Sequence, residues 1–213
     1  MLVDDHPLMR AGLVQLIQRQ KDFEVACECS GPAEALSALS HCHPDLLLTD
    51  LTMPGRSGVE FIKDVLALNP SLRILVVSMR DEMVYAERVL RAGARGYLMK
   101  EAGGEKLLES MRRVLSGQIA VSERLSARLL EQMTGGRPRG SDSPIQRLSD
   151  REFEVFQWIG RGLGTQDIAR QLHLSPKTVD VHRGHIKEKL GLRSGPELMR
   201  HAVRWVESEQ EGG

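Results

Sequence analysis

The chain of 213 residues carries 29 basic and 29 acidic side chains, so it has no net charge, and 41% of its residues are hydrophobic. These values are typical of a globular protein with one large or two small domains, and they exclude a polybasic tail. No apolar run approaches the 18 or more residues that a membrane span needs, and residues 1–5 lack the features of a secretion signal. We therefore expect a cytoplasmic protein without membrane contact, whose binding to any nucleic acid depends on a local patch of charge.

The three cysteines are an odd number and show no CxxC spacing. Cys27 and Cys29 fall on one face of a strand-like run, and Cys42 lies in a helical segment. In a cytoplasmic chain this pattern favours reduced thiols in the core over a metal or redox site.

Residues 1–117 alternate short apolar runs with segments of helical periodicity. The sequence predicts strands at residues 2–3, 23–29, 46–49, 74–77 and 96–99. It predicts helices at residues 7–20, 32–43, 59–68, 82–92 and 106–115. This (βα)5 order indicates a flavodoxin-like α/β fold, in which helices cover both faces of a parallel five-stranded sheet.

Polar side chains follow four of these five strands. Asp4 and Asp5 follow the first strand, Asp50 the third, Ser78 the fourth and Lys100 the fifth. Because parallel strands end at the same edge of a sheet, we expect three carboxylates, a hydroxyl and an ammonium group on one rim.

That set of groups suits one kind of chemistry. Three close carboxylates repel one another unless a cation lies among them, and a site with only oxygen ligands favours Mg²⁺. Lys100 can pair with Asp50 or with a phosphoryl oxygen. The set therefore predicts phosphoryl transfer onto a carboxylate, with Asp50 as the nucleophile and Ser78 as a donor to the new phosphoryl group. The alternative is that these side chains merely solvate loops, which is less plausible for five residues than for one.

With Met53-Pro54-Gly55, Gly58 and Tyr97, these residues resemble the receiver domain of bacterial two-component response regulators over residues 1–117. The resemblance implies that a sensor histidine kinase phosphorylates Asp50 and that Ser78 and Tyr97 form a switch pair. It also implies that Lys100 contacts the phosphoryl group. Mg²⁺ would bind Asp5, Asp50 and the Thr52 carbonyl, with Asp4 helping through water. Only three residues precede the acidic pair, a short first strand that a trimmed start would explain.

Residues 118–144 are expected to form a linker. Leu125, Leu129 and Leu130 predict a helix at residues 122–133. Residues 135–144 are rich in Gly, Ser and Pro, which is typical of a flexible tether. Arg137 and Arg139 in this tether are expected to be solvated rather than bound to DNA.

Residues 145–213 have the pattern of a four-helix domain, with helices expected at residues 148–159, 165–173, 177–190 and 196–206. Ser149 or Asp150 caps the first of these with Glu152 behind it, and Ser175 caps the third ahead of Pro176. A short helix, a tight turn and a longer helix predict a helix-turn-helix, whose second helix enters the major groove of DNA. The alternative is a helical bundle with a charged, solvated face.

The groove-facing side of the third helix carries more basic than acidic groups. We expect contacts to phosphate from one set of residues: Lys177, Thr178, Arg183, Lys187 and Lys189. We expect Asp180, Val181 and Gly184 to face base edges.

The amino-acid sequences of three segments strengthen the helix-turn-helix interpretation. Residues 148–152, 168–172 and 174–183 resemble the LuxR-type helix-turn-helix, which dimerises largely through its last helix. Joined to a receiver, this resembles the NarL/FixJ class of response regulators. The resemblance implies a transcription factor, not an enzyme, that binds double-stranded DNA as a homodimer when phosphorylated.

Two rivals remain. In one, the first domain is a dimerisation platform that is not phosphorylated. In the other, the chain is a Mg²⁺-dependent phosphatase, although such enzymes commonly carry an acid at the position that Thr52 occupies here.

Overall fold

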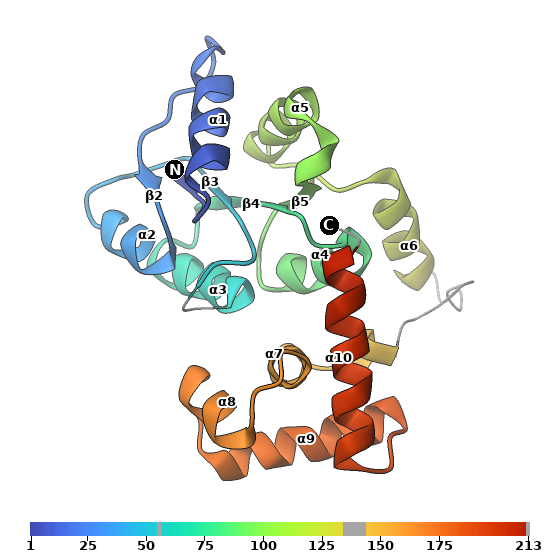
Figure 1. Cartoon of the computed structure of the whole chain (residues 1–213). Helices are drawn as coiled ribbons and strands as arrows, with labels where there is room; N and C mark the ends of the chain where they lie inside the picture. Colours follow the sequence, from blue (N-terminus) through green and yellow to red (C-terminus); the bar gives the residue numbers. More distant parts are fainter. Residues whose placement is uncertain (55–56, 134–143, 212–213) are drawn as a thin grey trace. The chain divides into compact units, whose positions relative to one another are not determined.

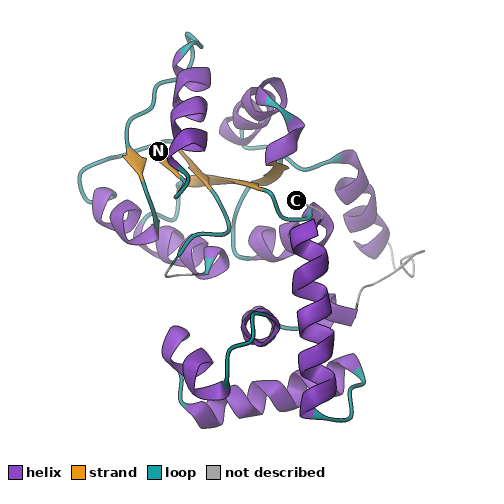
Figure 2. Cartoon of the chain, viewed as in Figure 1, coloured by secondary structure: helices purple, strands orange, loops and turns teal. Residues whose placement is uncertain are grey.

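The computed structural model describes residues 1–54, 57–133 and 144–211, and the chain divides into two compact units, Met1–Met133 and Thr134–Gly213 (Figure 1). Each unit has its own hydrophobic core. The first unit mixes strands and helices, whereas the described part of the second contains helices and connecting loops (Figure 2).

A parallel sheet forms the centre of the first unit, with the strand order β2-β1-β3-β4-β5. Its strands are β1 (Leu2–Val3), β2 (Glu28–Cys29), β3 (Leu46–Thr49), β4 (Arg73–Ser78) and β5 (Gly96–Met99). Strands β3 and β4 are apolar and almost wholly buried, as the sequence predicts for a sheet covered on both faces.

Helices pack on both faces of this sheet and complete the predicted flavodoxin-like fold (Figure 1). They are α1 (Pro7–Gln18), α2 (Pro32–Ala38), α3 (Gly58–Leu68), α4 (Glu82–Arg91) and α5 (Gly104–Leu115). Helices α1 and α5 cover one face, where Ile17 and Met111 join Leu48 and Leu75 in the core. Helices α2, α3 and α4 cover the other face.

The second strand is much shorter than the sequence predicts. The expected strand covers residues 23–29, but β2 contains only Glu28 and Cys29. Its neighbour β1 offers just Leu2 and Val3 as partners, so the ladder has no further residues to pair with. Phe23 and Val25 instead pack their side chains against the core.

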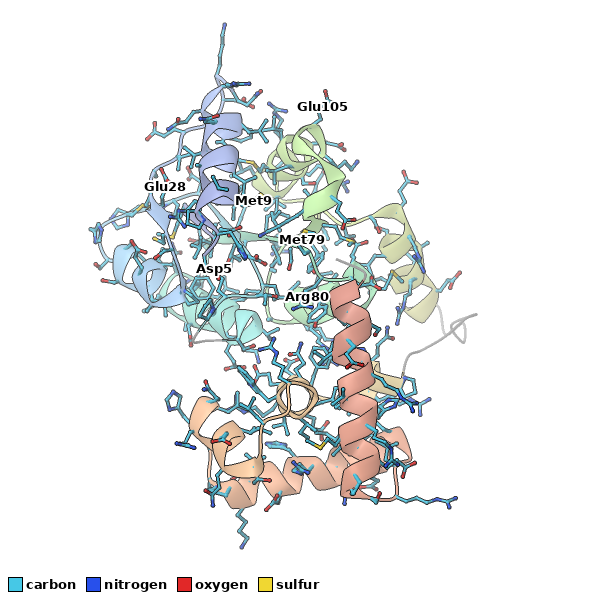
Figure 3. All side chains as sticks on the ribbon, viewed as in Figure 1. Asp5, Met9, Glu28, Met79, Arg80 and Glu105 are labelled. Atoms are coloured by element: carbon cyan, nitrogen blue, oxygen red, sulfur yellow. A yellow bond between two sulfur atoms is a disulfide. The ribbon has the colours of Figure 1, made fainter. Side chains whose placement is uncertain are left out.

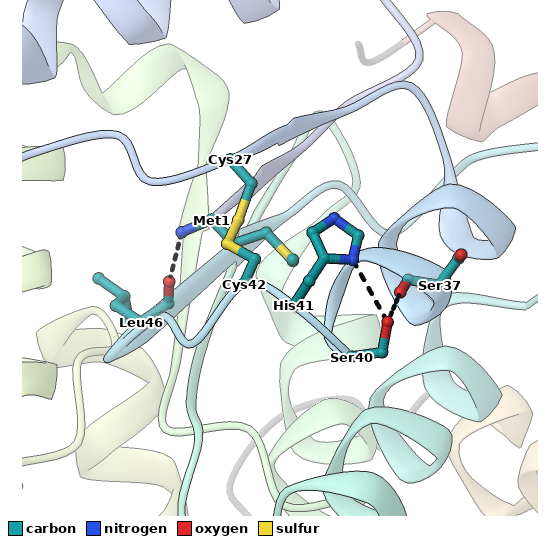
Figure 4. Close-up of a disulfide and its surroundings, with 7 residues drawn as sticks. All are labelled: Met1, Cys27, Ser37, Ser40, His41, Cys42 and Leu46. Carbon is teal, nitrogen blue, oxygen red and sulfur yellow. Dashed lines mark hydrogen bonds between the residues drawn. A yellow bond between two sulfur atoms is a disulfide. The ribbon is translucent and has the colours of Figure 1, made fainter.

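The prediction that all three cysteines are reduced is wrong for two of them. Cys27, just before β2, forms a disulfide with Cys42, which lies after α2 (Figure 4). Cys29 is free and buried, as expected. Cys27 precedes β2 and Cys42 precedes β3, so both lie near the amino ends of their strands, where their Cα atoms are 6.7 Å apart.

The linker helix belongs to the first unit. Helix α6 (Glu123–Met133) follows an isolated bridge between Gly96 and Ala120, and its Leu125 is buried. The backbone N–H of Ser122 donates to the Glu82 carboxylate at the start of α4, with N and O 2.8 Å apart. The tether predicted at residues 135–144, with Arg137 and Arg139, lies outside the described residues except for Pro144, which begins a 3-10 helix at Pro144–Arg147.

The second unit contains four α-helices in its described part, as predicted: α7 (Asp150–Gly160), α8 (Thr165–Gln171), α9 (Pro176–Leu190) and α10 (Gly195–Glu211). Ser149 and Glu152 form a capping box at the start of α7, which satisfies two backbone N–H groups there. In the core, the rings of Phe153 and Phe156 lie 5.3 and 5.7 Å from that of Trp205 on α10. None of the described helices is long and apolar enough to cross a membrane.

Candidate functional site

The carboxyl ends of the central strands bring the predicted side chains together. In the register of the sheet, Val3 lies beside Thr49, so the residues that follow them, Asp4 and Asp50, leave neighbouring strands at the same edge. Lys100 follows β5 in a 3-10 helix (Lys100–Ala102) and reaches both of these carboxylates. We call Asp4, Asp5, Asp50 and Lys100 the rim cluster.

Lys100 bridges two buried carboxylates. Its Nζ lies 2.8 Å from Oδ2 of Asp4 and 2.6 Å from Oδ2 of Asp50, and all three side chains are at most 5% exposed. Burial acts to lower the pKa of Lys100, but its hydrogen bonds with the two carboxylates outweigh burial and raise the pKa. Lys100 is therefore a cation at neutral pH, although one ammonium group does not balance the acids around it.

The two oxygens of Asp50 have different surroundings. Oδ1 accepts hydrogen bonds from the backbone N–H groups of Leu51, at 2.5 Å, and Thr52, at 3.2 Å. Oδ2 contacts the Lys100 ammonium group. The backbone thus fixes the orientation of the carboxylate, and Oδ2 is the oxygen directed at the cation.

Asp4 and Asp5 differ in whether their carboxylate oxygens have hydrogen-bond partners. Oδ1 of Asp4 accepts a hydrogen bond from the backbone N–H of His6 at 2.8 Å, and its Oδ2 pairs with Lys100. Oδ1 of Asp5 is buried and lies 3.0 Å from Nδ1 of His6, yet it accepts no hydrogen bond from any residue that the structure describes. Asp5, in the loop after β1, is labelled in Figure 3 together with Arg80, in the loop after β4. Asp5 therefore has an oxygen available for a further ligand, whereas both oxygens of Asp4 are engaged.

The oxygens of these acids fit a small divalent cation. Asp4, Asp5, His6 and Asp50 each place one potential ligand atom within 4.8 Å of the others. Hard oxygen ligands of this kind suit Mg²⁺, and the buried, unsatisfied oxygen of Asp5 is the group that such an ion would satisfy. His6 is a potential ligand that the sequence did not predict. Its position directly after the acidic pair was the only sequence signal for it.

Ser78 ends β4, and Tyr97 lies within the neighbouring strand β5. Their side chains are buried, and burial raises the pKa of Tyr97 well above its ordinary value, although the nearby Ser78 hydroxyl acts to lower it. The Tyr97 hydroxyl donates to the carbonyl of Arg80 at 2.7 Å, and Oγ of Ser78 accepts from the backbone N–H of Arg80 at 3.4 Å. Both predicted switch residues therefore contact the loop between β4 and α4.

Arg80 is a second residue that sequence reasoning missed. Besides its backbone contacts with Ser78 and Tyr97, its Nε donates to Oγ1 of Thr52 at 3.3 Å. Thr52 belongs to the loop after Asp50, so Arg80 connects the loops that follow β3 and β4. The predicted role of the Thr52 carbonyl as a metal ligand stays a prediction.

The second unit presents the predicted helix-turn-helix. Oγ of Ser175 accepts from the backbone N–H of Thr178 at 3.0 Å and caps α9, and Pro176 occupies the first turn. Val179 and Ile186 are buried against the other helices, as expected. The opposite side of α9 leaves Lys177, Asp180, Val181 and Gly184 exposed, with Val181 49% exposed.

The other residues expected at the DNA have varied surroundings. Arg183 and Lys187 are partly buried on α9. Oδ1 of Asp180 accepts from the hydroxyl of Thr165 at 3.2 Å, which ties α9 to the start of α8. Nζ of Lys189 lies 2.6 Å from Oε2 of the buried Glu152 on α7, a contact that competes with any contact to phosphate.

Comparisons with known proteins cover both units. Residues 1–112 match the family model for the response regulator receiver domain, and residues 146–202 match the model for bacterial regulatory proteins of the luxR family. The oxygen regulatory protein NreC of Staphylococcus aureus is 36% identical to this chain over an alignment of 207 residues, and the match covers 95% of each protein.

Solved structures agree with the family matches. RcsB from Salmonella enterica serovar Typhimurium, bound to promoter rprA with the phosphomimetic BeF3⁻, is 25% identical with a TM-score of 0.73. The match covers 95% of this chain and 96% of that one. A structure of two RcsB dimers bound to two parallel DNAs has 25% identity and a TM-score of 0.58, with the same coverage.

Proposed function

This chain belongs to the two-component response regulators that join a receiver domain to a LuxR-type DNA-binding domain, and on that premise we propose that Asp50 accepts a phosphoryl group from a sensor histidine kinase and thereby controls DNA binding. The observation that carries the proposal is the Lys100 bridge between Asp4 and Asp50 at the carboxyl edge of the sheet. We place the receiver domain at residues 1–117, the linker at 118–144 and the DNA-binding domain at 145–213. The protein is a transcription regulator and not an enzyme.

Asp50 is the proposed nucleophile because backbone N–H groups and Lys100 fix the orientation of its carboxylate. The N–H groups of Leu51 and Thr52 hold Oδ1, so Oδ2 attacks the phosphorus of the donor, a P–O bond forms, and the bond to the donor's leaving nitrogen breaks. Lys100 then moves its contact from Oδ2 to an oxygen of the phosphoryl group, whose negative charge it stabilises.

Three of the acidic groups would hold Mg²⁺. Asp5 and Asp50 would bind the ion directly with the Thr52 carbonyl, and Asp4 would act through water because its oxygens already contact His6 and Lys100. When bound, Mg²⁺ neutralises the charge that develops on the transferring phosphoryl group.

The conformational change on phosphorylation would be transmitted by the loop between β4 and α4, which contains Arg80. The new phosphoryl group attracts the Ser78 hydroxyl, and the backbone of Arg80 follows because it contacts both Ser78 and Tyr97. This shifts the start of α4 and the face formed by α4, β5 and α5, and it favours a homodimer.

DNA recognition would use α9 in the major groove. We propose phosphate contacts for Lys177, Thr178, Arg183 and Lys187, and base-edge positions for Asp180, Val181 and Gly184. We leave Lys189 out of the phosphate set because it pairs with Glu152. The two paired units of a dimer would bind two half-sites of double-stranded DNA.

Incubation with acetyl phosphate and Mg²⁺ tests the phosphorylation step. We expect intact mass to rise by one phosphoryl group in the wild type and not in Asp50→Asn, because Asp50 is the proposed nucleophile and the asparagine amide cannot replace its carboxylate. Affinity for DNA, measured before and after this incubation, should change in the wild type alone. If Asp50 stays unmodified, or if Asp50→Asn responds like the wild type, the chain acts as the unphosphorylated dimerisation platform instead.

A further inference from the structure

A second cluster of metal-ligating side chains lies in the DNA-binding unit, between α7 and α9. Glu152 on α7 and His182 and His185 on α9 each place one potential ligand atom within 4.8 Å of the other two. His182 and His185 are three residues apart on a helix, a spacing that puts both imidazoles on the same side of α9. Figure 1 shows α7 and α9 in the same unit, and the two helices pack against each other.

The carboxylate of Glu152 is held in place through one of its oxygens. Oε2 contacts Nζ of Lys189 at 2.6 Å and accepts from the backbone N–H of Ser149 at 2.7 Å. Oε1 lies on the side of His185, 3.5 Å from its Nδ1, which is too long for a good hydrogen bond. Partners of this kind on one oxygen orient a carboxylate ligand while its other oxygen binds a metal.

His182 supplies an independent observation. Its Nδ1 is buried and has no hydrogen-bond partner within the described part of the chain. A buried polar atom without a partner costs free energy, and a bound cation would relieve that cost.

We propose that Glu152, His182 and His185 bind a transition-metal ion of the zinc type. Two imidazole nitrogens and one carboxylate oxygen form a ligand set that suits Zn²⁺, with water in the fourth tetrahedral position. His185 is about half exposed, with 54% of its side chain accessible, so the ion can enter from solvent. The ion would link the start of α7 to the middle of α9, and it would hold the DNA-reading helix against the rest of its unit.

The alternative is that His185 is simply an ion-pair partner of Glu152. Zinc titration of the full-length chain separates these possibilities. The protein is freed of metal by a chelator and kept without reductant, so that the disulfide Cys27–Cys42 stays closed. Excess Mg²⁺ occupies the acidic groups of the rim cluster, and Zn²⁺ binding is then measured by calorimetry.

The matched variants are His185→Gln and His6→Gln. Each removes one exposed histidine from one of the two clusters of potential ligands, so each should leave the fold intact by circular dichroism. We expect one zinc site with the same affinity in the wild type and in His6→Gln. In His185→Gln the affinity should fall at least about 100-fold, since even the loss of outer partners of a ligand costs 10–100-fold.

Co²⁺ provides a second readout that a structural role would not produce. A tetrahedral site in the wild type and in His6→Gln should give visible absorption bands that are absent from His185→Gln. The proposal is overturned if the wild type binds no zinc, if His185→Gln binds it as the wild type does, or if His6→Gln is the variant that loses it.

Discussion

Lys100 is the residue on which the rim cluster depends. Its ammonium group is the partner of two carboxylates that have almost no access to water. A buried charge that loses its partner is strongly destabilising, whereas exposed ion pairs contribute little. The chain offers an exposed comparison in Lys106, which pairs with Glu109 on the surface of α5.

We predict that Lys100→Met destabilises the receiver domain by about 3 kcal/mol at neutral pH, because Asp4 and Asp50 are left as uncompensated buried charges. Mg²⁺ should restore part of this stability, since the ion replaces the missing cation. Urea denaturation with and without Mg²⁺, followed by circular dichroism, measures both effects. Lys106→Met should change stability by less than about 1 kcal/mol. Equal losses in the two variants would contradict the role given to Lys100.

Residue patterns identified much of the rim cluster, but not its contacts. Strand ends in a parallel sheet predicted that Asp4, Asp50 and Lys100 would lie at one edge, and the structure places them there. The sequence could not show that His6 and Arg80 join this region. Their involvement depends on the paths of loops, and loop conformation has no periodic signal in the sequence.

At the scale of elements, the sequence predicted types better than ends. Strands 46–49 and 96–99 are confirmed residue for residue, and every helix expected in the described residues is present. The helix expected at residues 32–43 ends at Ala38, after which Ser40 and His41 donate to carbonyls three residues earlier, and β2 pairs with β1 only through Glu28 and Cys29. Tertiary pairing, which the sequence does not display, decides such limits.

The disulfide escaped prediction for a similar reason. Cys27 and Cys42 are separated by 15 residues, and their proximity depends on the tertiary arrangement of the segments that lead into β2 and β3. The count and spacing of cysteines carry no information on that arrangement. An assumption about the compartment therefore decided the expectation, and it was wrong for this pair.

Two glycines of the DNA-binding unit show how element packing limits substitution. A Cβ at Gly160 on α7 would lie 2.4 Å from the carbonyl oxygen of Ala202 on α10, so the two helices would have to separate. A Cβ at Gly184 on α9 would meet nothing within 4 Å.

We predict that Gly160→Ala destabilises this unit by about 1–3 kcal/mol through overpacking. Gly184→Ala, its control, should stabilise the unit by about 0.5–1 kcal/mol, because alanine favours a helix more than glycine does. Both tryptophans, Trp158 and Trp205, lie in this unit, so tryptophan fluorescence during urea unfolding reports on it alone. Destabilisation in both variants would mean that α9 tolerates no added side chain at its outer face.

At the scale of the whole molecule, the chain has no net charge, so the proposed contact with DNA depends on a local surplus of positive charge on α9. Contacts to phosphate and to bases then have different signatures. A phosphate contact strengthens binding to every sequence and depends on salt, whereas a base contact determines which sequence is preferred.

Lys187→Ala should weaken binding to all duplexes and reduce the salt slope by about one. Asp180→Ala should instead change the sequence that is recovered from a random duplex pool, because Asp180 is proposed to face base edges. Anisotropy titrations at several salt concentrations and selection from the pool measure these effects, with Lys106→Ala in the receiver domain as the control. A changed preference in Lys187→Ala would reassign that residue to base reading.

The contact between Glu82 and Ser122 connects the start of α4 to the segment just before α6. Glu82 stands at the start of α4, two residues after Arg80, and its carboxylate holds the backbone just ahead of α6. We predict that movement of the loop containing Arg80 is transmitted through this contact to α6. In Glu82→Ala, acetyl phosphate should still modify Asp50, but DNA affinity should respond less than in the wild type. The Glu82 carboxylate would then be the group through which phosphorylation of Asp50 displaces α6.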